Sequence, residues 1–522
     1  MPDFTAHNSA SQQEVFAFLG DPATHGGKAV DRIDTHGAAV FLAGDRALKV
    51  KRAVRFPFLD YSTLSKRKEA CEQELTVNRR FAPQIYRRVV AITRTADGSL
   101  QLGGDGAIVE WALEMTRFDE RQTVDHLAAA GPIEFGLVAA IAEAIAASHK
   151  AAPEAETAPW VASIPSIIAG NSNAFRAAGG FDAEQVAALD RLSLAAFERI
   201  RPLLQRRGQQ GFVRHCHGDL HLANIALINH RPVLFDAIEF DPKIASIDVL
   251  YDLAFPLMDF IHNQRRDAAN LLLNRYLAIT SDANLDALAA LPLLMSMRAG
   301  IRANVMLSRP ARDAAAAQAI RREADGYFAL ALRLISPPPP RLIAVGGLSG
   351  TGKSVLARAL AGLVEPAPGA VLLRSDVARK QHFGVNETDR LPEHAYRPDV
   401  TATVYRTLAE RAQLVLAQGH SAIVDAVFAR PDERKAIAAV ATKMKVPFDG
   451  VFLATDLATR IERVSRRTAD ASDATPEIVK RQQDYDPGSI DWTIVDASGS
   501  PQQTLQRATA ALALDAGQAC RT

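Results

Sequence analysis

One short motif constrains the fold of this 522-residue chain more than any other feature. The residues Gly347-Leu-Ser-Gly-Thr-Gly-Lys-Ser354 match G-x-x-x-x-G-K-[ST], and they stand between the apolar run RLIAVG and the helical run VLARALAGL. Glycines in such a loop let backbone N-H groups wrap around phosphates at a helix N-terminus, while the lysine reaches the outer phosphates and the serine hydroxyl ligates Mg2+. The phosphate-binding residues predicted from the motif are Gly347, Ser349, Gly350, Thr351, Gly352, Lys353 and Ser354.

The residues after residue 340 predict a parallel α/β sheet. Five short apolar runs, RLIAVGG, AVLLRSD, HSAIVDA, FDGVFLA and WTIVDAS, are separated by stretches with helical periodicity. This alternation is typical of a P-loop NTPase with a parallel sheet. We therefore expect a P-loop domain over residues 341–522.

The region before Ser336 has a different pattern and predicts an α+β fold with two lobes. Strand-like AAVFLAGD and RALKVKR precede a helical stretch and a third strand-like run, AIVEWALEM, and the chain from about Thr123 onward is mostly helical. Pro337 to Pro340 favour a stiff extended linker. We expect one domain over 1–336, with a small lobe at about 25–118 and a helical lobe at about 119–336, and a linker at 337–340.

A second set of polar residues in the first domain has catalytic spacing. In H-G-D-L-H-L-A-N, Asp219 and Asn224 are five residues apart, and Asp236 follows the strand-like PVLF. Protein kinases space their catalytic Asp, metal-binding Asn and magnesium Asp in this way. Asp219 is thus the candidate that orients or deprotonates a hydroxyl, and Asn224 and Asp236 are the candidate ligands of Mg2+.

The H-G-D-x-H-x-x-N motif resembles the aminoglycoside phosphotransferase and choline kinase group more closely than true protein kinases. By this resemblance, which covers about residues 30 to 330, Lys49 grips the α and β phosphates of ATP and pairs with a helix glutamate. Glu74 is our candidate, although Glu69 or Glu72 could serve. The resemblance also places a hinge that contacts adenine at 110–118. The family's glycine-rich nucleotide loop is reduced to Thr35-His36-Gly37 and Gly44.

Three residue groups in the second domain are candidates for acceptor and nucleotide chemistry. Asp376 ends the strand-like AVLLRSD and Arg379 follows one helical turn later, which resembles the acceptor site of polynucleotide kinases and small-molecule P-loop kinases, where the Asp is the general base. Asp425 ends a strand and suits Mg2+ or substrate. Basic residues on one helix face resemble the lid of such kinases: Arg460, Arg463 and Arg467. A helix N-cap role for Asp376 and a solvated basic face for the arginines remain alternatives.

The histidines and cysteine around the catalytic loop could also be read as a metal cluster, since Cys and His are zinc ligands. No second pair at zinc-site spacing supports this reading of His215, Cys216, His217 and His221. We expect His217 and Cys216 to be structural, and Asp248 and Asp252 to brace the loop.

Both modules in this order resemble a bacterial fusion of an aminoglycoside phosphotransferase-like, protein-kinase-like domain with a C-terminal AAA-type P-loop kinase domain of the polynucleotide, gluconate and zeta-toxin kinase kind. The resemblance implies a bifunctional kinase that uses ATP and Mg2+ and phosphorylates hydroxyl groups of small molecules. The alternatives are that the C-terminal domain is a polynucleotide 5′-kinase, or that one module is a nucleotide-binding regulatory domain.

The charge and the cysteines bear on partners and location. The net charge is +1, and residues 337–522 hold 23 Lys and Arg against 21 Asp and Glu, which does not favour nucleic acid. Three dispersed cysteines, no signal peptide pattern and no apolar run of membrane-spanning length predict a cytoplasmic protein without a membrane partner. The sequence does not determine the oligomeric state.

Overall fold

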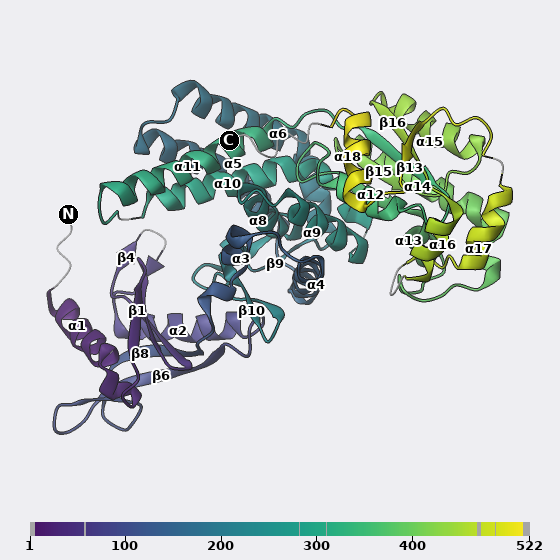
Figure 1. Ribbon diagram of the computed structural model, residues 1–522. Coiled ribbons are helices and arrows are strands. Elements are labelled where there is room, and N and C mark those ends of the chain that lie inside the picture. Colours follow the sequence, from purple (N-terminus) through teal and green to yellow (C-terminus); the bar gives the residue numbers. More distant parts are fainter. Residues whose placement is uncertain are drawn as a thin grey trace. The chain divides into compact units, whose positions relative to one another are not determined.

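A computed structural model describes residues 6–56, 59–280, 282–309, 311–466, 471–485 and 487–514 (Figure 1). The chain forms two compact units. Unit 1 comprises 1–133, 144–162 and 205–255, and unit 2 comprises 134–143, 163–204 and 256–522. Both sides of the proline segment pack into unit 2, and the division into domains at 336–341 stays a prediction.

Unit 1 begins with an antiparallel sheet in the order β1-β2-β3-β8-β6-β7. The strands are β1 Val30–Asp34, β2 Ala38–Ala43, β3 Arg46–Lys51, β6 Tyr86–Arg94, β7 Leu100–Leu102 and β8 Ala107–Thr116. A tight turn joins β2 to β3, where Gly44 has a φ of 59° that glycine adopts without strain. The predicted strand pair and the strand AIVEWALEM are thus confirmed.

Two helices pack on this sheet. Helix α1 (Ala6–Gly20) buries Val15 and Leu19 against Phe41 and Leu48. Helix α2 (Leu64–Asn78) is capped by Thr63, whose hydroxyl accepts a hydrogen bond from the Lys66 N-H. The side chains of Glu74 and Asn78 on this helix are buried. Polar residues at these buried positions are the first structural sign of a site. The small elements here are η1 Pro22–His25, β4 Arg55–Phe56 and β5 Leu59–Asp60.

The remainder of unit 1 forms around short strands that carry the catalytic-loop sequence. They are β9 Val213–His215, β10 Ile225–Ile228, β11 Arg231–Leu234 and β12 Ser246–Asp248, with β10 paired to β11 and β12 to β9. The helices beside them are η2 Glu120–Gln122, α3 Val124–Ala130, η3 Leu222–Asn224 and α7 Pro242–Ala245. Four longer helices contribute to both units: α4 Phe135–Ala151, α5 Thr157–Ala178, α6 Ala183–Gln209 and α8 Val249–His262.

Unit 2 contains a five-stranded parallel sheet in the order β14-β15-β13-β16-β17. Its strands are β13 Leu342–Gly347, β14 Val371–Arg374, β15 Ala422–Asp425, β16 Phe448–Ala454 and β17 Thr493–Asp496. The central strand β13 is buried at every residue, as its unbroken apolar sequence predicts. The predicted parallel α/β fold is confirmed.

Helices cover this sheet and extend beyond it (Figure 1). They are α12 Lys353–Ala361, α13 Ser375–His382, η6 Glu393–Tyr396, α14 Pro398–Ala417, α15 Pro431–Met444, α16 Leu457–Ser465, α17 Pro476–Arg481, η7 Gln482–Asp484 and α18 Pro501–Ala511. The unit also includes α9 Arg266–Ile279, η4 Asp282–Asn284, η5 Leu288–Ala290, α10 Leu291–Leu307 and α11 Ala314–Ile335. No helix in the described ranges is long and apolar enough to cross a membrane.

Helix α9 fastens the outer strand β14 through two asparagines. Asn270 and Asn274 both donate to the Ala370 carbonyl, at 3.0 and 3.1 Å, and Asn274 accepts from the Leu372 N-H at 2.7 Å. Side-chain amides thereby satisfy backbone groups at the edge of the sheet.

Candidate functional sites

A lysine in unit 1 joins a helix carboxylate to a loop carboxylate. Lys49 Nζ on β3 lies 2.7 Å from Glu74 Oε1 and 2.9 Å from Asp236 Oδ1. Burial would lower the Lys49 pKa, but Asp236 and Glu74 raise it well above its usual value. The predicted partner is therefore Glu74, while Glu69 accepts from Ser65 and Glu72 pairs with Lys68 on the exposed face of α2.

A second lysine extends this network, and the sequence reasoning missed it. Lys51 Nζ lies 2.5 Å from both Glu74 Oε2 and Glu239 Oε1. Burial would raise the Glu74 pKa, but Lys49 and Lys51 outweigh it and hold that pKa at about 2. Lys51 stands two residues after Lys49 on β3, so both side chains lie on the same face of the sheet. This spacing could have predicted from the sequence that Lys51 lies beside Lys49.

The segment that carries Asp236 is held by the small lobe. Asn78 on α2 accepts from the Ala237 N-H at 2.7 Å and donates to the Ala237 carbonyl at 3.2 Å. The Asp236 N-H donates to the Tyr86 hydroxyl at 3.0 Å. Asp236 itself has a φ of 59°, a left-handed conformation that costs energy in a non-glycine residue and is found in functional loops.

The catalytic-loop motif folds into one compact group. Asn224 Nδ2 donates to the Asp219 carbonyl at 2.8 Å, so the two candidate residues adjoin. Asp252 accepts from the N-H groups of His217 and Gly218, at 3.1 and 2.9 Å. Asp252 thus braces the loop, as predicted.

The histidine of this motif is structural. His217 is fully buried, its Nε2 lies 2.8 Å from the Phe235 carbonyl oxygen, and burial lowers its pKa. Among the described residues, Cys216 forms a cluster with His149 and Asp252 instead. One possible ligand atom from each of the three side chains lies within 4.8 Å of the other two. Because Asp252 already accepts two backbone N-H groups there, the cluster serves as a brace for the loop.

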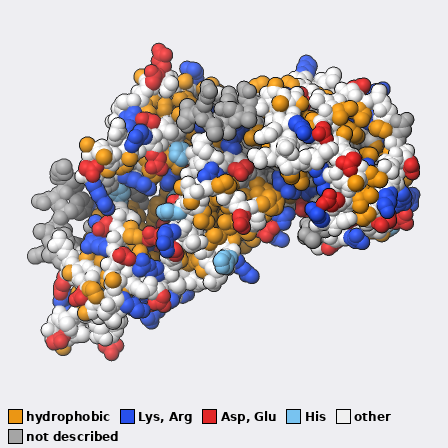
Figure 2. All heavy atoms as spheres, viewed as in Figure 1, with side chains coloured by type: hydrophobic (Ala, Val, Ile, Leu, Met, Phe, Trp, Pro, Cys, Tyr) orange, Lys and Arg blue, Asp and Glu red, His pale blue; other side chains and the backbone are white. Residues whose placement is uncertain are grey.

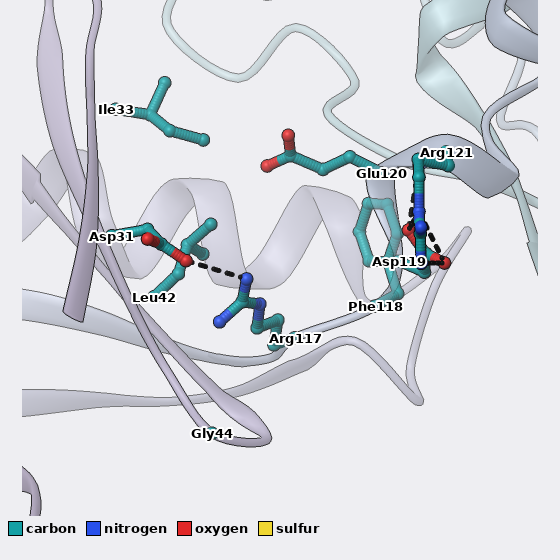
Figure 3. A pocket seen from close by; sticks show the side chains of 9 residues that line it. All are labelled: Asp31, Ile33, Leu42, Gly44, Arg117, Phe118, Asp119, Glu120 and Arg121. Carbon is teal, nitrogen blue, oxygen red and sulfur yellow. Dashed lines mark hydrogen bonds and ion pairs between the residues drawn. The ribbon is translucent and has the colours of Figure 1, made fainter. Parts of the chain in front are cut away.

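A cavity of about 590 Å3 opens beside the sheet of unit 1 (Figure 3). It lies between β1, β2 and the segment after β8. Apolar Ile33, Leu42 and Phe118 face charged groups, among them Asp31 and Arg117, which pair at 3.0 Å. The other lining residues are Gly44, Asp119, Glu120 and Arg121.

The structure corrects the expected position of the hinge. Residues 110–116 belong to strand β8, and the connecting segment begins at Arg117. The expected hinge range thus overlapped the strand-like run AIVEWALEM at 107–115, which the sequence also predicted. The short turn Thr35-His36-Gly37 between β1 and β2 matches the reduced nucleotide loop expected from the sequence.

In unit 2 the P-loop lies between β13 and α12, where its motif predicted it. Gly347, Gly350 and Gly352 have φ values of 135°, 86° and 95°. A Cβ on Gly350 would lie 2.6 Å from the Arg460 carbonyl oxygen, so only glycine fits. Lys353 begins α12, and its Nζ donates to the Leu348 carbonyl at 3.2 Å.

Two carboxylates stand at the ends of strands beside this loop. Asp425 ends β15, next to β13, and Asp376 lies in the first turn of α13, directly after β14. Burial and the nearby Asp425 raise the Asp376 pKa, while Lys353 and Arg374 oppose the shift. The carboxyl ends of adjacent parallel strands therefore bring Asp376, Asp425 and Lys353 into one region.

Arg379 lies on α13 with Asp376. It is 6% exposed, donates to the Ala395 carbonyl at 2.6 Å and lies 4.9 Å from the ring centroid of Tyr396. Beside it, Lys380 pairs with Asp473 at 2.7 Å, an interaction the sequence reasoning missed.

The predicted lid arginines bind protein backbone in this structure. Arg460 Nε donates to the Ser349 carbonyl at 2.9 Å, and Arg463 donates to the carbonyls of Thr351, Ala497 and Gly499. Arg467 lies outside the described residues. Gln482, also missed, accepts from the Ser349 N-H at 2.8 Å. Arg460 and Arg463 thus brace the P-loop, and a direct contact with phosphate stays a prediction.

Comparisons with known proteins agree with this two-part architecture. Residues 342–486 match the AAA domain family. Uncharacterized proteins of Mycobacterium tuberculosis and Mycobacterium bovis are 29% identical over 499 residues, which are 92% of this chain and 94% of theirs. The match therefore spans both parts of this chain and nearly the whole length of these relatives.

Solved structures match each part separately. A choline/ethanolamine kinase family protein from Mesorhizobium loti is 15% identical and covers 62% of this chain and 99% of its own, with a TM-score of 0.34. A gluconokinase from Sinorhizobium meliloti 1021 is 23% identical and covers 33% of this chain and 92% of its own, with a TM-score of 0.25. The AAA domain match locates the P-loop part of the chain at residues 342–486.

Proposed function

We propose that this protein is a bifunctional ATP-dependent phosphotransferase, with one site in each unit, that phosphorylates hydroxyl groups of small molecules. The observation that carries the proposal is the bridge from Lys49 to Glu74 and Asp236. A partly buried lysine held between these carboxylates has the arrangement that protein kinases use to grip nucleotide phosphates beside a metal ligand.

In the unit 1 site the residues divide the work of phosphoryl transfer. Lys49 neutralises charge on the α and β phosphates, held in place by Glu74. The Asp236 carboxylate and the Asn224 side-chain oxygen are hard oxygen donors of the kind that Mg2+ prefers, so this donor set fits that ion. Bound Mg2+ would neutralise charge on the transferred phosphate.

Asp219 orients the acceptor hydroxyl and accepts its proton. A loose phosphoryl-transfer transition state leaves most of the catalytic work to position and charge. The Asn224 amide and the Asp252 brace fix the loop that holds Asp219. The cavity beside Phe118 supports binding of the nucleotide base, since Ile33, Leu42 and Phe118 give it an apolar part beside its charged residues. The Phe118 ring also packs edge-on against Phe235, next to Asp236.

In the unit 2 site the P-loop N-H groups and Lys353 hold the nucleotide phosphates. Ser354 and Asp425 supply oxygen donors suited to Mg2+. Asp376, whose pKa is raised, takes the proton of the acceptor hydroxyl, and a raised pKa makes it a better base in its ionised form. Arg460 and Arg463 keep the loop in its binding shape.

Nucleic acid is a less suitable acceptor. Figure 2 shows basic and acidic side chains interspersed on the visible face, in accord with the net charge of +1. A nucleic-acid site ordinarily presents clustered basic residues.

The test is product analysis with matched variants. The full chain is incubated with ATP and a panel of sugars, amino alcohols and nucleosides, and phosphorylated products are identified by mass spectrometry. We expect Asp219→Asn to remove one class of product and Asp376→Asn another. Products that persist in the double variant would refute both assignments, and 5′-labelling of DNA or RNA would favour a polynucleotide kinase.

A further inference from the structure

Two ion pairs join the segment that carries Asp236 to strand β3 of unit 1. Lys49 pairs with Asp236 at 2.9 Å, and Lys51 pairs with Glu239 at 2.5 Å. We call the first the outer pair and the second the inner pair. Glu74 on α2 contacts both lysines, at 2.7 and 2.5 Å. The segment is therefore held to the strand and to the helix at two points, three residues apart.

The two pairs differ in their exposure to solvent. The Asp236 side chain is 46% exposed, so a ligand can reach its carboxylate. The side chains of Lys51 and Glu239 are only 4% and 9% exposed. Removing one partner from an ion pair this deeply buried leaves an uncompensated charge and is strongly destabilising. The outer pair can thus exchange partners with a ligand, whereas the inner pair is protected from such exchange.

Lys51 stands between two carboxylates that repel each other. Burial and the neighbouring Glu74 raise the Glu239 pKa, and Lys51 opposes this shift. Burial would lower the Lys51 pKa, but Glu74 and Glu239 raise it above its usual value. The charge of Lys51 therefore holds α2 and the segment together, and without it the two carboxylates would push these elements apart.

Nucleotide binding at the proposed site engages both members of the outer pair, because Lys49 turns to the phosphates and Asp236 to the metal ion. The inner pair then remains to hold the segment, together with the hydrogen bonds that Asn78 and Tyr86 make to its backbone. Asp236 has a φ of 59°, and a left-handed residue of this kind persists only where surrounding contacts fix it. The segment therefore needs a hold that does not depend on Lys49.

We propose that Lys51 is a positioning residue of the unit 1 site, which holds the segment through Glu239 and so keeps Asp236 at the metal position when nucleotide binds. This inference rests on the proposed function of that site. Lys51 contacts neither the nucleotide nor the acceptor in this role.

The experiment uses the full chain with Lys353→Met, so that nucleotide binding reports on the unit 1 site. Calorimetry measures the affinity for a non-hydrolysable ATP analogue, once with Mg2+ and once with EDTA. We expect Lys51→Met to reduce the affinity in Mg2+ by about tenfold or more, because the metal-ligand segment loses a buried ion pair, and to leave the affinity in EDTA unchanged. Lys66→Met is the matched control, since Lys66 pairs with Asp60 and is 45% exposed. It should change neither affinity.

Glu239→Gln tests whether Lys51 acts through Glu239. This substitution keeps the size of the side chain and leaves Lys51 paired with Glu74, so it disturbs the fold less than Lys51→Met does. It should reproduce the loss in Mg2+, and the double variant should be no weaker than either single variant, because coupled substitutions are not additive. Hydrogen exchange without any ligand should become about tenfold or more faster in peptides that cover residues 235–241, in both variants.

The outcomes separate this inference from the proposed function. An unchanged affinity in Mg2+ for Lys51→Met, an equal loss in Mg2+ and in EDTA, or additive effects of the two substitutions would each overturn the inference. An equal loss would indicate a direct phosphate contact or a general loss of structure. If the chain with Lys353→Met alone fails to bind the analogue, the proposed function of unit 1 is wrong and the inference falls with it.

Discussion

Replacing Glu74 by glutamine tests whether the buried lysine network holds the unit 1 site together. Glu74 is fully buried, and its carboxylate contacts both Lys49 and Lys51. Removing its charge leaves the partly buried Lys49 and the buried Lys51 with one acidic partner each, Asp236 and Glu239. The loss of a partner from a buried ion pair typically costs about 3–5 kcal/mol.

The pKa of Glu74 gives a comparable magnitude. A shift from 4.5 to about 2 corresponds to roughly 3 kcal/mol, at about 1.4 kcal/mol per pH unit. Because the folded-state pKa is lower than that of the unfolded chain, this stabilisation is complete above about pH 4.5 and is lost as the pH falls toward 2.

Hydrogen exchange measured by mass spectrometry on the full chain reports this loss locally, in peptides from β3 and α2. At pH 7 we expect Glu74→Gln to reduce the free energy of local opening by about 3 kcal/mol. The measured difference is smaller where exchange in the wild type already occurs through global unfolding. Glu72→Gln is the control, since its pair with Lys68 is exposed and such a pair contributes about 0.5 kcal/mol or less. Equal protection in the two variants would refute the reasoning.

Three further results are expected. His420 is fully buried, and burial lowers its pKa to about 4, whereas the histidine of the unfolded chain binds a proton near pH 6.5. The free energy of unfolding of unit 2 should therefore fall by roughly 3 kcal/mol from pH 6.5 to pH 4. Denaturant titrations of the His420→Leu variant should lack this pH dependence. Asn274→Leu leaves the Leu372 N-H without its acceptor and should destabilise unit 2 by about 1–3 kcal/mol in urea titrations, whereas Asn173→Leu on an exposed helix surface should change little. Lys353→Met should reduce turnover at the unit 2 site by about a hundredfold or more while circular dichroism stays unchanged, and wild-type turnover would exclude the P-loop from catalysis.

Local signals in the sequence were sufficient for much of the fold. The strands around Gly44, the strand AIVEWALEM and the five parallel strands of unit 2 each combine an apolar run with a clear boundary, and all were predicted. The hinge range was taken from a family resemblance and overlapped strand β8, whose pairing with β3 and β6 extends to Thr116 and Met115.

In the candidate sites, too, local motifs were predicted and contacts between distant residues were not. Motif spacing identified Lys49, Asp219 and Asp236 and left the choice among three glutamates open, because which helix face meets β3 is decided by packing. Glu239, Asp473 and Gln482 were missed for a different reason. Each acts through a partner more than 90 residues away, Lys51, Lys380 and Ser349 respectively, and no spacing rule connects such distant pairs.

The central claim is that one chain holds two separate nucleotide sites, and the stoichiometry of nucleotide binding tests it most directly. Calorimetric titration of the full chain with a non-hydrolysable ATP analogue and Mg2+ should give two molecules bound per chain. Lys49→Met and Lys353→Met should each reduce this number to one, and the double variant should bind none. A stoichiometry of one in the wild type, or a single substitution that removes all binding, would contradict the account.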